Sequence, residues 1–247
     1  MEQRCRATVE YDGFDFLGFQ VQAQGRTIQG ELERAIERVT QRRIRVVGAG
    51  RTDAGVHAVG QVIAFTAVWR HSIQDLHRAL NAVLPAEIAI THLAVTHPGF
   101  HPRFDAIWRQ YRYTVLNRPV RSPLRGRYAH QVRGSIDVAA MRAASQYLIG
   151  HRDFAAFGKP TQGESTVREV KRAEWFVDGN ELAFEITANA FLYRMVRNIV
   201  GTLLRVGGGD LKPGEVVTLL ESGDRAAVGP PAPVSYTHLT LPTTPYV

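Results

Sequence analysis

One acidic side chain lies in a short segment whose residues allow close contact with a ligand. Residues 48–58 read Gly-Ala-Gly-Arg-Thr-Asp-Ala-Gly-Val-His-Ala, with glycines on both sides of the Arg51-Thr52-Asp53 unit. Glycine lets the backbone turn tightly and approach a ligand closely. The small neighbours of Asp53 leave its carboxylate sterically open. This segment therefore predicts a nucleophile or base.

Arg51 stands two residues before Asp53. In an extended chain the two side chains point to the same side, and a guanidinium beside a carboxylate keeps it ionised. Arginine also binds phosphate, so the pair indicates chemistry on a nucleotide. The alternative is a glycine-rich turn with a structural ion pair. A phosphate-cradling P-loop is excluded because its Gly-x4-Gly-Lys-Ser/Thr pattern is absent, and one Asp with one distant His does not make a metal site.

A second segment, residues 101–133, combines many arginines with aromatic residues and holds a single acid, Asp105. Basic residues follow a phosphodiester backbone, and aromatic rings stack on unpaired bases. The alternative is that Tyr111 and Tyr113 are core residues of a strand whose other face is solvated. The arginines are Arg103, Arg109, Arg112, Arg118, Arg121, Arg125, Arg127 and Arg133, and the aromatic residues between them include Phe104, Trp108, Tyr111 and Tyr113.

The third segment, residues 189–201, opens the longest expected helix, which spans residues 191–206. Its apolar side chains form one stripe, and Arg194, Arg197, Gly201 and Arg205 form a neighbouring one. Gly201 would let this stripe pack closely against another element. Taken alone, the pattern favours a core helix with a solvated arginine edge.

Composition supports a globular protein with a polyanionic partner. Of the 247 residues, 45% are hydrophobic, which is ample for one large domain or two small ones. The formal net charge is +7, and the basic residues are arginines except for Lys159, Lys171 and Lys212. Cys5 is the one cysteine, so no internal disulfide is possible. With no long apolar run and no expected secretory signal, we expect a cytoplasmic protein that does not bind a membrane.

Hydrophobic periodicity predicts alternating strands and helices of an α+β fold. We expect an N-terminal half at residues 1–98 that carries Asp53, and a C-terminal half at 99–225 with the basic aromatic strand and the arginine-bearing helix. Residues 226–247 contain no charged side chain and five prolines, and we expect an atypical tail that is non-native or disordered. The expected strands are 4–12, 61–68, 87–95, 106–116, 167–176 and 181–187, and the expected helices are 27–40, 72–84, 137–149, 191–206 and 213–220.

Together the three segments resemble the TruA family of tRNA pseudouridine synthases. Residues 50–58 match the family's catalytic motif residue for residue, residues 11–13 and 18–20 resemble its opening motif, and residues 104–113 and 189–201 resemble its second and third motifs. The likeness covers roughly residues 4–225. It implies a pseudouridine synthase fold, with a mostly antiparallel mixed sheet flanked by helices, in two related halves around a basic cleft.

The resemblance also implies residue roles and partners. The family's nucleophilic aspartate falls on Asp53, its substrate-contacting tyrosine on Tyr111, the arginine that pairs with the nucleophile on Arg197, and the arginine that displaces the target base on Arg51. The family works as a homodimer, without metal or organic cofactor, on uridines 38, 39 and 40 of the tRNA anticodon stem-loop.

The C-terminal segment departs from the family pattern, and two alternative functions remain open. The family normally ends in a Gly-Leu-x-Leu-x-x-Val-x-Tyr strand, whereas residues 234–247 do not continue in that way after Ala232-Pro233. A cloning scar, a gene boundary or a frame change would each explain this tail. The alternative functions are a pseudouridine synthase for another RNA site and a non-catalytic RNA-binding module on the same fold. A metal-dependent nuclease is disfavoured because clustered acids are lacking.

Overall fold

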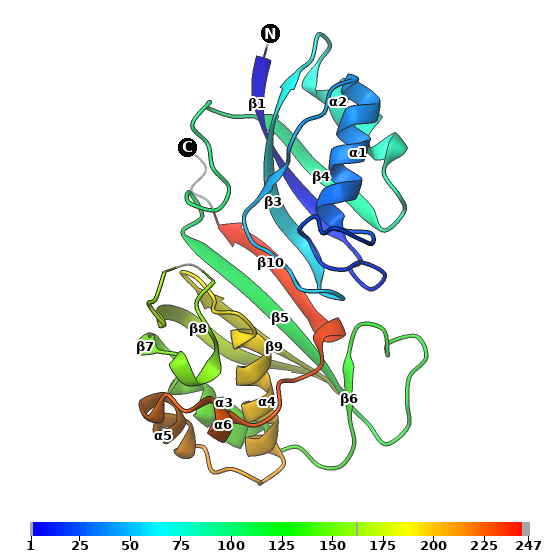
Figure 1. Ribbon diagram of the computed structural model, residues 1–247. Coiled ribbons are helices and arrows are strands. Elements are labelled where there is room, and N and C mark those ends of the chain that lie inside the picture. Colours follow the sequence, from blue (N-terminus) through cyan, green and yellow to red (C-terminus); the bar gives the residue numbers. More distant parts are fainter. Residues whose placement is uncertain (1, 162, 244–247) are drawn as a thin grey trace. The chain divides into compact units, whose positions relative to one another are not determined.

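The computed structural model describes residues 2–161 and 163–243, and it divides the chain into two compact units. Unit 1 comprises Met1–Ile107 and His238–Val247, and unit 2 comprises Trp108–Thr237. Each unit holds a sheet with helices packed on it (Figure 1). The unit boundary lies after the division expected at residue 98, and the sequence-based domain limits remain a prediction.

The sheet of unit 1 has the strand order β4-β1-β3-β10, and the two-residue strand β2 also pairs with β3. All its pairings are antiparallel except that of β10 with β3. Helices α1 and α2 lie together on one face (Figure 1). The elements are β1 (Glu2–Tyr11), α1 (Ile28–Thr40), β2 (Val47–Gly48), β3 (His57–Val68), α2 (Ile73–Val83), β4 (Ile88–Val95) and β10 (Thr237–Thr243).

Local sequence explains these elements. Alternate residues of β1 are buried, as expected for a strand with one face on a core. The side chain of Thr27 accepts a hydrogen bond from the Gly30 N–H and begins α1, while Ser72 and Asp75 form a reciprocal capping box at the start of α2. Strand β3 is buried on both faces, and its residues Val62 and Ala64 form a small buried cluster with Ala49 and Phe100.

The sheet of unit 2 has the order β5-β9-β8-β7, with the short strand β6 parallel to β5. Strands β8 and β9 form the hairpin expected around residues 178–180, with Gly179 at a positive φ of 56°. The elements are β5 (Trp108–Asn117), β6 (His130–Val132), α3 (Val138–Gln146), β7 (Gly150–Asp153), the 3-10 helix η1 (Ala155–Phe157), β8 (Val167–Asp178), β9 (Glu181–Ala188), α4 (Met195–Gly207), α5 (Glu215–Ser222), α6 (Arg225–Val228) and the 3-10 helix η2 (Val234–Tyr236).

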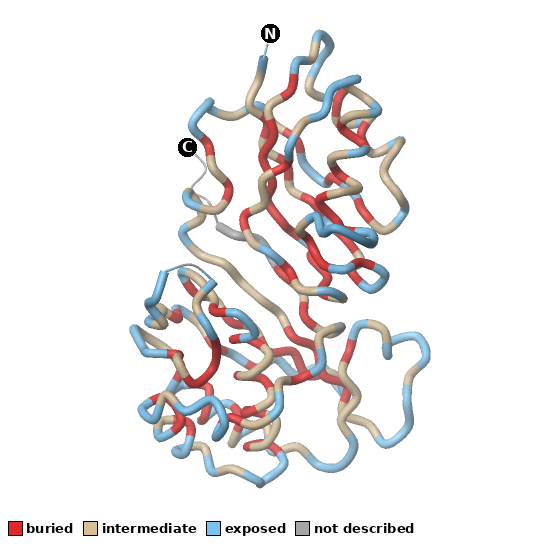
Figure 2. Tube along the Cα trace, in the orientation of Figure 1, coloured by how far each residue is buried: buried red, intermediate tan, exposed pale blue. Residues whose placement is uncertain are grey.

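A large hydrophobic core holds unit 2 together, and buried segments run along its sheet and through α4 (Figure 2). Phe184 on β9 is fully buried and packs against Trp175 at a ring-centroid distance of 5.0 Å. The buried face of α4 contributes Met195, Ile199 and Val200 to the same core. The α+β class with a mixed, mostly antiparallel sheet and flanking helices is therefore confirmed.

The largest boundary errors are at the starts of α4 and β3, by four residues each. Helix α4 begins at Met195 instead of Phe191, because the Tyr193 N–H donates to the Lys159 carbonyl in an isolated β-bridge and Arg194 adopts a left-handed conformation with φ of 63°. Strand β3 begins at His57, four residues before the expected start. Among the described residues, no helix has the length and apolar character needed to cross a membrane.

Replacing Phe184 with alanine should lower the free energy of unfolding by about 3–5 kcal/mol, because a large buried ring would leave a cavity. Phe176→Ala is the control, since Phe176 lies on the paired strand β8 but is partly exposed. Chemical denaturation followed by circular dichroism measures both. Equal losses in the two variants would contradict this assignment of the core.

Candidate active site

The segment that carries Asp53 is the loop between β2 and β3 in unit 1, residues 49–56. Its first part is tied to β3, because the Ala49 N–H donates to the Val62 carbonyl at 2.8 Å and the Gln61 side-chain amide donates to the Gly50 carbonyl at 2.9 Å. Gln61 is fully buried. The loop is therefore fixed from its start.

Residues 11–19 hold the second part of the loop. The Phe19 N–H donates to the Thr52 carbonyl at 3.0 Å, and the Gly55 N–H donates to the Phe16 carbonyl at 3.3 Å. The hydroxyls of Tyr11 and Thr52 lie 2.8 Å apart in a buried hydrogen bond. Main chain and side chain thus hold the loop on both sides of Asp53.

Two glycines permit this close approach. A Cβ on Gly13 would overlap the Val56 carbonyl, and a Cβ on Gly18 would lie 2.7 Å from the Thr52 carbonyl oxygen. Gly18 also has φ of 91°, which side-chain-bearing residues rarely adopt. Residues 11–13 and 18–20 therefore brace the loop that carries Asp53. These residues were assigned no role from the sequence, although Gly13 and Gly18 could have indicated a close backbone contact.

His57 closes the loop where β3 begins. Its ring is buried and stacks on His238 of β10 at a centroid distance of 4.9 Å. Its Nδ1 lies 3.2 Å from the Gly13 N and 3.0 Å from an Asp12 carboxylate oxygen. One nitrogen cannot serve both partners at once: neutral Nδ1 accepts from Gly13, whereas a protonated Nδ1 donates to Asp12. Either bond ties the end of the loop to the 11–19 segment.

Within this loop, Arg51 is exposed, Thr52 is buried and Asp53 is half-buried. The buried Thr52 anchors the loop, and its two neighbours, Arg51 and Asp53, lie closer to the surface. Among the salt bridges of residues 2–161 and 163–243, none joins Arg51 to Asp53, so the ion pair suggested by their spacing is absent. Ala54, directly after Asp53, is exposed as well, which keeps the carboxylate in an open part of the loop.

Unit 2 carries the other two predicted residues, Tyr111 and Arg197. Tyr111 lies on β5 opposite Ile186 of β9 and is half-buried, with its ring edge-to-face against Phe191 at 4.9 Å. Tyr113, two residues further on the same face, is fully buried and belongs to the core. Of the two strand tyrosines, only Tyr111 keeps a partly accessible ring.

Arg197 lies on α4, close to Tyr113. Burial raises the pKa of the Tyr113 hydroxyl above its usual range, and neighbouring Tyr236 adds to this effect, whereas the charge of Arg197 lowers that pKa. The hydroxyl of Tyr113 has no hydrogen-bond partner within the described part of the chain. The guanidinium of Arg197 thus lies near the aromatic face of β5, in the same unit as Tyr111.

The arginine stripe of α4 binds the following segment instead of facing solvent alone. Arg197 Nε donates to the Ala232 carbonyl at 2.7 Å, and the Ala232 N–H returns a bond to the Arg197 carbonyl at 3.0 Å. Arg205 donates to the Val228 carbonyl at 3.2 Å. Gly201 makes room, since a Cβ there would lie 2.6 Å from the Pro230 carbonyl oxygen. The close packing expected at Gly201 is confirmed, and the solvated-edge interpretation of Arg197 and Arg205 is wrong.

Several arginines of the basic aromatic segment are paired within unit 2. Arg112 forms a salt bridge of 2.8 Å with Glu185, and Arg125 pairs with Glu181. Arg109 donates to the Asn189 carbonyl at 2.6 Å. These contacts come from β9 and its ends, which lie far from β5 in the sequence. Part of the segment's charge is therefore neutralised by acids that the local sequence does not contain.

No group of three or more His, Cys, Asp or Glu side chains suited to a metal ion occurs in the portion of the chain that the structure describes. The chemistry available at the braced loop is that of a carboxylate with an arginine nearby.

Comparison with known proteins gives matches over most of the chain. A family model described as tRNA pseudouridine synthase matches residues 7–105 and 144–238. The protein named tRNA pseudouridine synthase A of Chloroflexus aurantiacus is 48% identical over 237 residues, covering 93% of this chain and 84% of its own. Its namesake in Brevibacillus brevis is 44% identical over 94% of this chain and 95% of its own, and that of Bacillus subtilis is 41% identical over 93% and 94%.

Among solved structures, a chain of the archaeal box H/ACA sRNP Nop10-Cbf5 complex aligns with 13% identity over 96% of this chain and 47% of its own, at a TM-score of 0.39. That score is too low to establish a common fold.

The match of these relatives over most of a chain with an α+β fold defines an RNA-modifying enzyme. The chain belongs to the tRNA pseudouridine synthase family. It is an isomerase that converts uridine to pseudouridine in tRNA.

Replacing Gly18 with alanine should displace the Thr52 carbonyl and lower the rate of pseudouridine formation by about 100-fold, the effect of a displacement of about 1 Å in a catalytic group. Gly209→Ala is the control, because Gly209 has a similar φ of 85° but open space around its Cβ position. Turnover and the free energy of unfolding are measured together. Similar activity losses in the two variants would assign the effect to backbone strain and contradict a role for the brace.

Proposed function

We propose that this enzyme isomerises uridines 38, 39 and 40 of the tRNA anticodon stem-loop, with Asp53 as the nucleophile. The observation that carries the proposal is the unbroken segment 50–58, which holds a half-buried aspartate between two anchored residues. Family membership supports tRNA as the substrate, and the resemblance of the motifs supports the anticodon stem-loop.

The reaction needs few chemical groups. The N1–C1′ glycosidic bond breaks, the uracil turns, and a bond forms between C1′ and C5, while C5 loses a proton and N1 gains one. No electrons enter or leave, so no redox partner or group donor is required. Drawing the target base out of its stack costs a few kcal/mol. A carboxylate close to the sugar then either attacks C1′ or assists elimination through a glycal, and both routes use Asp53.

Three side chains would serve this carboxylate. Arg51, exposed beside Asp53, would contact phosphate and fill the space that the displaced base leaves. Tyr111, whose ring is partly accessible, would stack on the uracil. Arg197, held at its Nε by the Ala232 carbonyl, would orient Asp53 and keep it ionised.

We propose further that the enzyme works as a homodimer in the cytoplasm without metal or organic cofactor. The family resemblance supports the dimer. The single cysteine, Cys5, is buried, and burial raises the pKa of its thiol, so it suits a structural position in a reducing compartment. Light scattering on the full chain, with and without tRNA, tests the dimer; a monomer at all working concentrations would contradict it.

Asp53→Asn should abolish turnover while tRNA affinity changes by less than about twofold, because the amide keeps the shape of the side chain but cannot act as a nucleophile. Asp210→Asn removes one exposed carboxylate from unit 2 and is the charge-matched control. Single-turnover assays and binding measurements on the same tRNA separate the two effects. Full activity of the Asp53 variant would remove the proposed role.

Arg197→Lys should lower the rate constant about 100-fold or more, since a lysine cannot hold the Ala232 carbonyl and reach Asp53 with one planar group. Arg205→Lys is the matched control on the same helix, because Arg205 also binds a carbonyl of the 227–232 segment. If both variants lose activity in step with their stability, Arg197 has only a structural role.

A further inference from the structure

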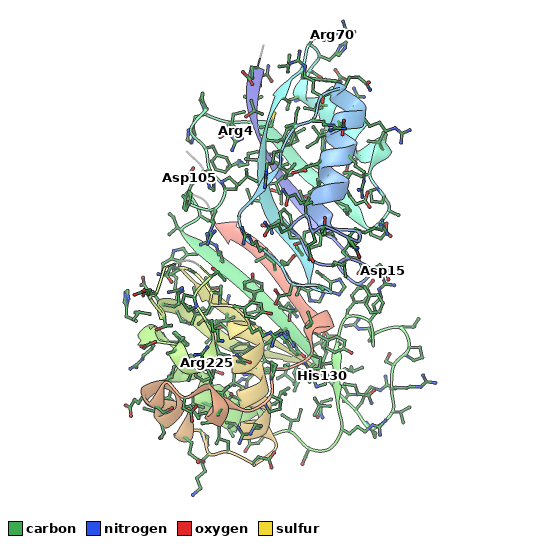
Figure 3. The ribbon with its side chains drawn as sticks, viewed as in Figure 1. Arg4, Asp15, Arg70, Asp105, His130 and Arg225 are labelled. Atoms are coloured by element: carbon green, nitrogen blue, oxygen red, sulfur yellow. The ribbon has the colours of Figure 1, made fainter. Side chains whose placement is uncertain are left out.

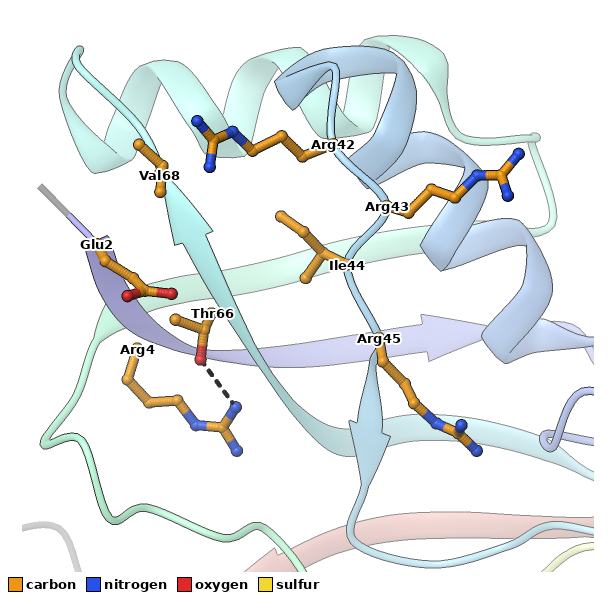
Figure 4. A pocket seen from close by; sticks show the side chains of 8 residues that line it. All are labelled: Glu2, Arg4, Arg42, Arg43, Ile44, Arg45, Thr66 and Val68. Carbon is orange, nitrogen blue, oxygen red and sulfur yellow. Dashed lines mark hydrogen bonds between the residues drawn. The ribbon is translucent and has the colours of Figure 1, made fainter.

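A basic pocket lies in unit 1 among residues to which neither the family motifs nor the proposed mechanism gives a role. Its volume is about 320 Å³, and it lies where the segment after α1 crosses the start of β1 and the end of β3 (Figure 4). Its lining residues are Glu2, Arg4, Arg42, Arg43, Ile44, Arg45, Thr66 and Val68.

The segment that carries three of the arginines is fixed at both ends. Helix α1 ends at Thr40, and Gln41 turns the chain with a left-handed φ of 57° while its N–H caps the Glu37 carbonyl. At the other end Val46 is buried, its N–H donates to Glu33 at 3.0 Å, and its carbonyl accepts from Gln29 at 3.1 Å. Residues 42–45 are therefore a short span between two anchors.

Positive charge dominates the pocket. Arg4 is held in place by bonds from Nε and Nη2 to the Phe100 carbonyl, at 3.2 and 3.0 Å, and from Nη1 to the Thr66 hydroxyl at 3.2 Å. Arg43 turns away and pairs with Glu37 (Figure 4). The guanidinium groups of Arg42 and Arg45 make no hydrogen bond or ion pair among residues 2–161 and 163–243, although the Arg42 carbonyl accepts a hydrogen bond from the Thr40 hydroxyl at 3.4 Å. Glu2 is the one carboxylate of the lining.

Such a cluster fits a phosphate group. Guanidinium groups bind phosphate with planar, paired hydrogen bonds, and the guanidinium groups of Arg42 and Arg45, which have no protein partner in the described part of the chain, attract an anion. A volume of about 320 Å³ lies at the lower end of ligand pockets, which suits one phosphate with its sugar better than an extended cofactor.

The pocket is remote from the end of the loop that carries Asp53 and leads into His57. Thr66 lies nine positions after His57 on β3, and a strand rises ~3.3 Å per residue, so roughly 30 Å lies between the two residues. Arg4 near the pocket and Asp15 in the bracing segment lie toward opposite ends of unit 1 (Figure 3). One nucleotide cannot reach both places, whereas a folded RNA can.

We propose that this pocket binds a backbone phosphate of the tRNA outside the stem-loop that carries the target uridine. The inference rests on the proposed function for its substrate. The pocket then favours RNAs whose shape and length place a phosphate in it. It does not distinguish bases, since phosphate contacts position a nucleic acid without reading its sequence.

The test compares Arg42→Gln/Arg45→Gln with wild type on full-length tRNA and on an isolated anticodon stem-loop. For full-length tRNA, the double variant should weaken binding several-fold at about 0.1 M salt and reduce the slope of log affinity against log salt by about 1. For the stem-loop, affinity should match wild type, because that RNA does not extend to the pocket.

The charge-matched control is Arg38→Gln/Arg78→Gln, which removes two arginines from the exposed surfaces of α1 and α2 that do not line the pocket. Equal losses in the two double variants, or a loss on the stem-loop as large as on full-length tRNA, would overturn the proposal. So would tight binding of inorganic phosphate by wild type at constant ionic strength together with unchanged tRNA affinity in Arg42→Gln/Arg45→Gln. If no pseudouridine forms, the proposed function fails, while the affinity comparison still decides the pocket.

Discussion

The close contact between the backbones of residues 13–19 and 52–56 is the constraint on which the site depends. At Gly13 and Gly18 the two segments approach so closely that no side chain would fit between them. The buried hydrogen bond between the Tyr11 and Thr52 hydroxyls adds a side-chain contact. Because β1 and β3 are neighbours in one sheet, the loops at their ends meet without a long connection. The sheet thus supplies rigidity, and Asp53 occupies a loop whose neighbours on both sides are fixed.

In unit 2, contacts between α4 and the segment that follows it fix the position of Arg197. Gly201 lets the chain at Pro230 approach α4, and Arg197 uses one nitrogen to hold the Ala232 carbonyl. This hydrogen bond restricts the conformations that the long side chain of Arg197 can adopt. Tyr111 is supported differently, by the pairing of β5 with β9 and by the ring of Phe191. Each proposed functional side chain therefore rests on an element whose backbone is independently fixed.

Long periodic elements could be predicted from the sequence, and contacts between distant segments could not. The apolar stripe of α1 and the turn at Gly179 are local signals, and both appear in the structure. Strands β2, β6 and β7 were missed because they are very short, and β10 was missed because it has an unusual composition and pairs with β3, which lies far along the chain. The start of α4 was misplaced because the Lys159–Tyr193 bridge overrides helix propensity. The motif at residues 50–58 could be recognised from the sequence alone. The contacts that Tyr11 and Gly18 make with it depend on the pairing of β1 with β3.

The most direct test of the account is a map of pseudouridine in an unmodified tRNA after incubation with the purified full chain. Chemical detection at each uridine of the anticodon arm reports both the reaction and its position. The account predicts pseudouridine at positions 38, 39 and 40 wherever a uridine occurs there, and none in a reaction with Asp53→Asn. Binding of the tRNA without product, or product only at other positions, would contradict it.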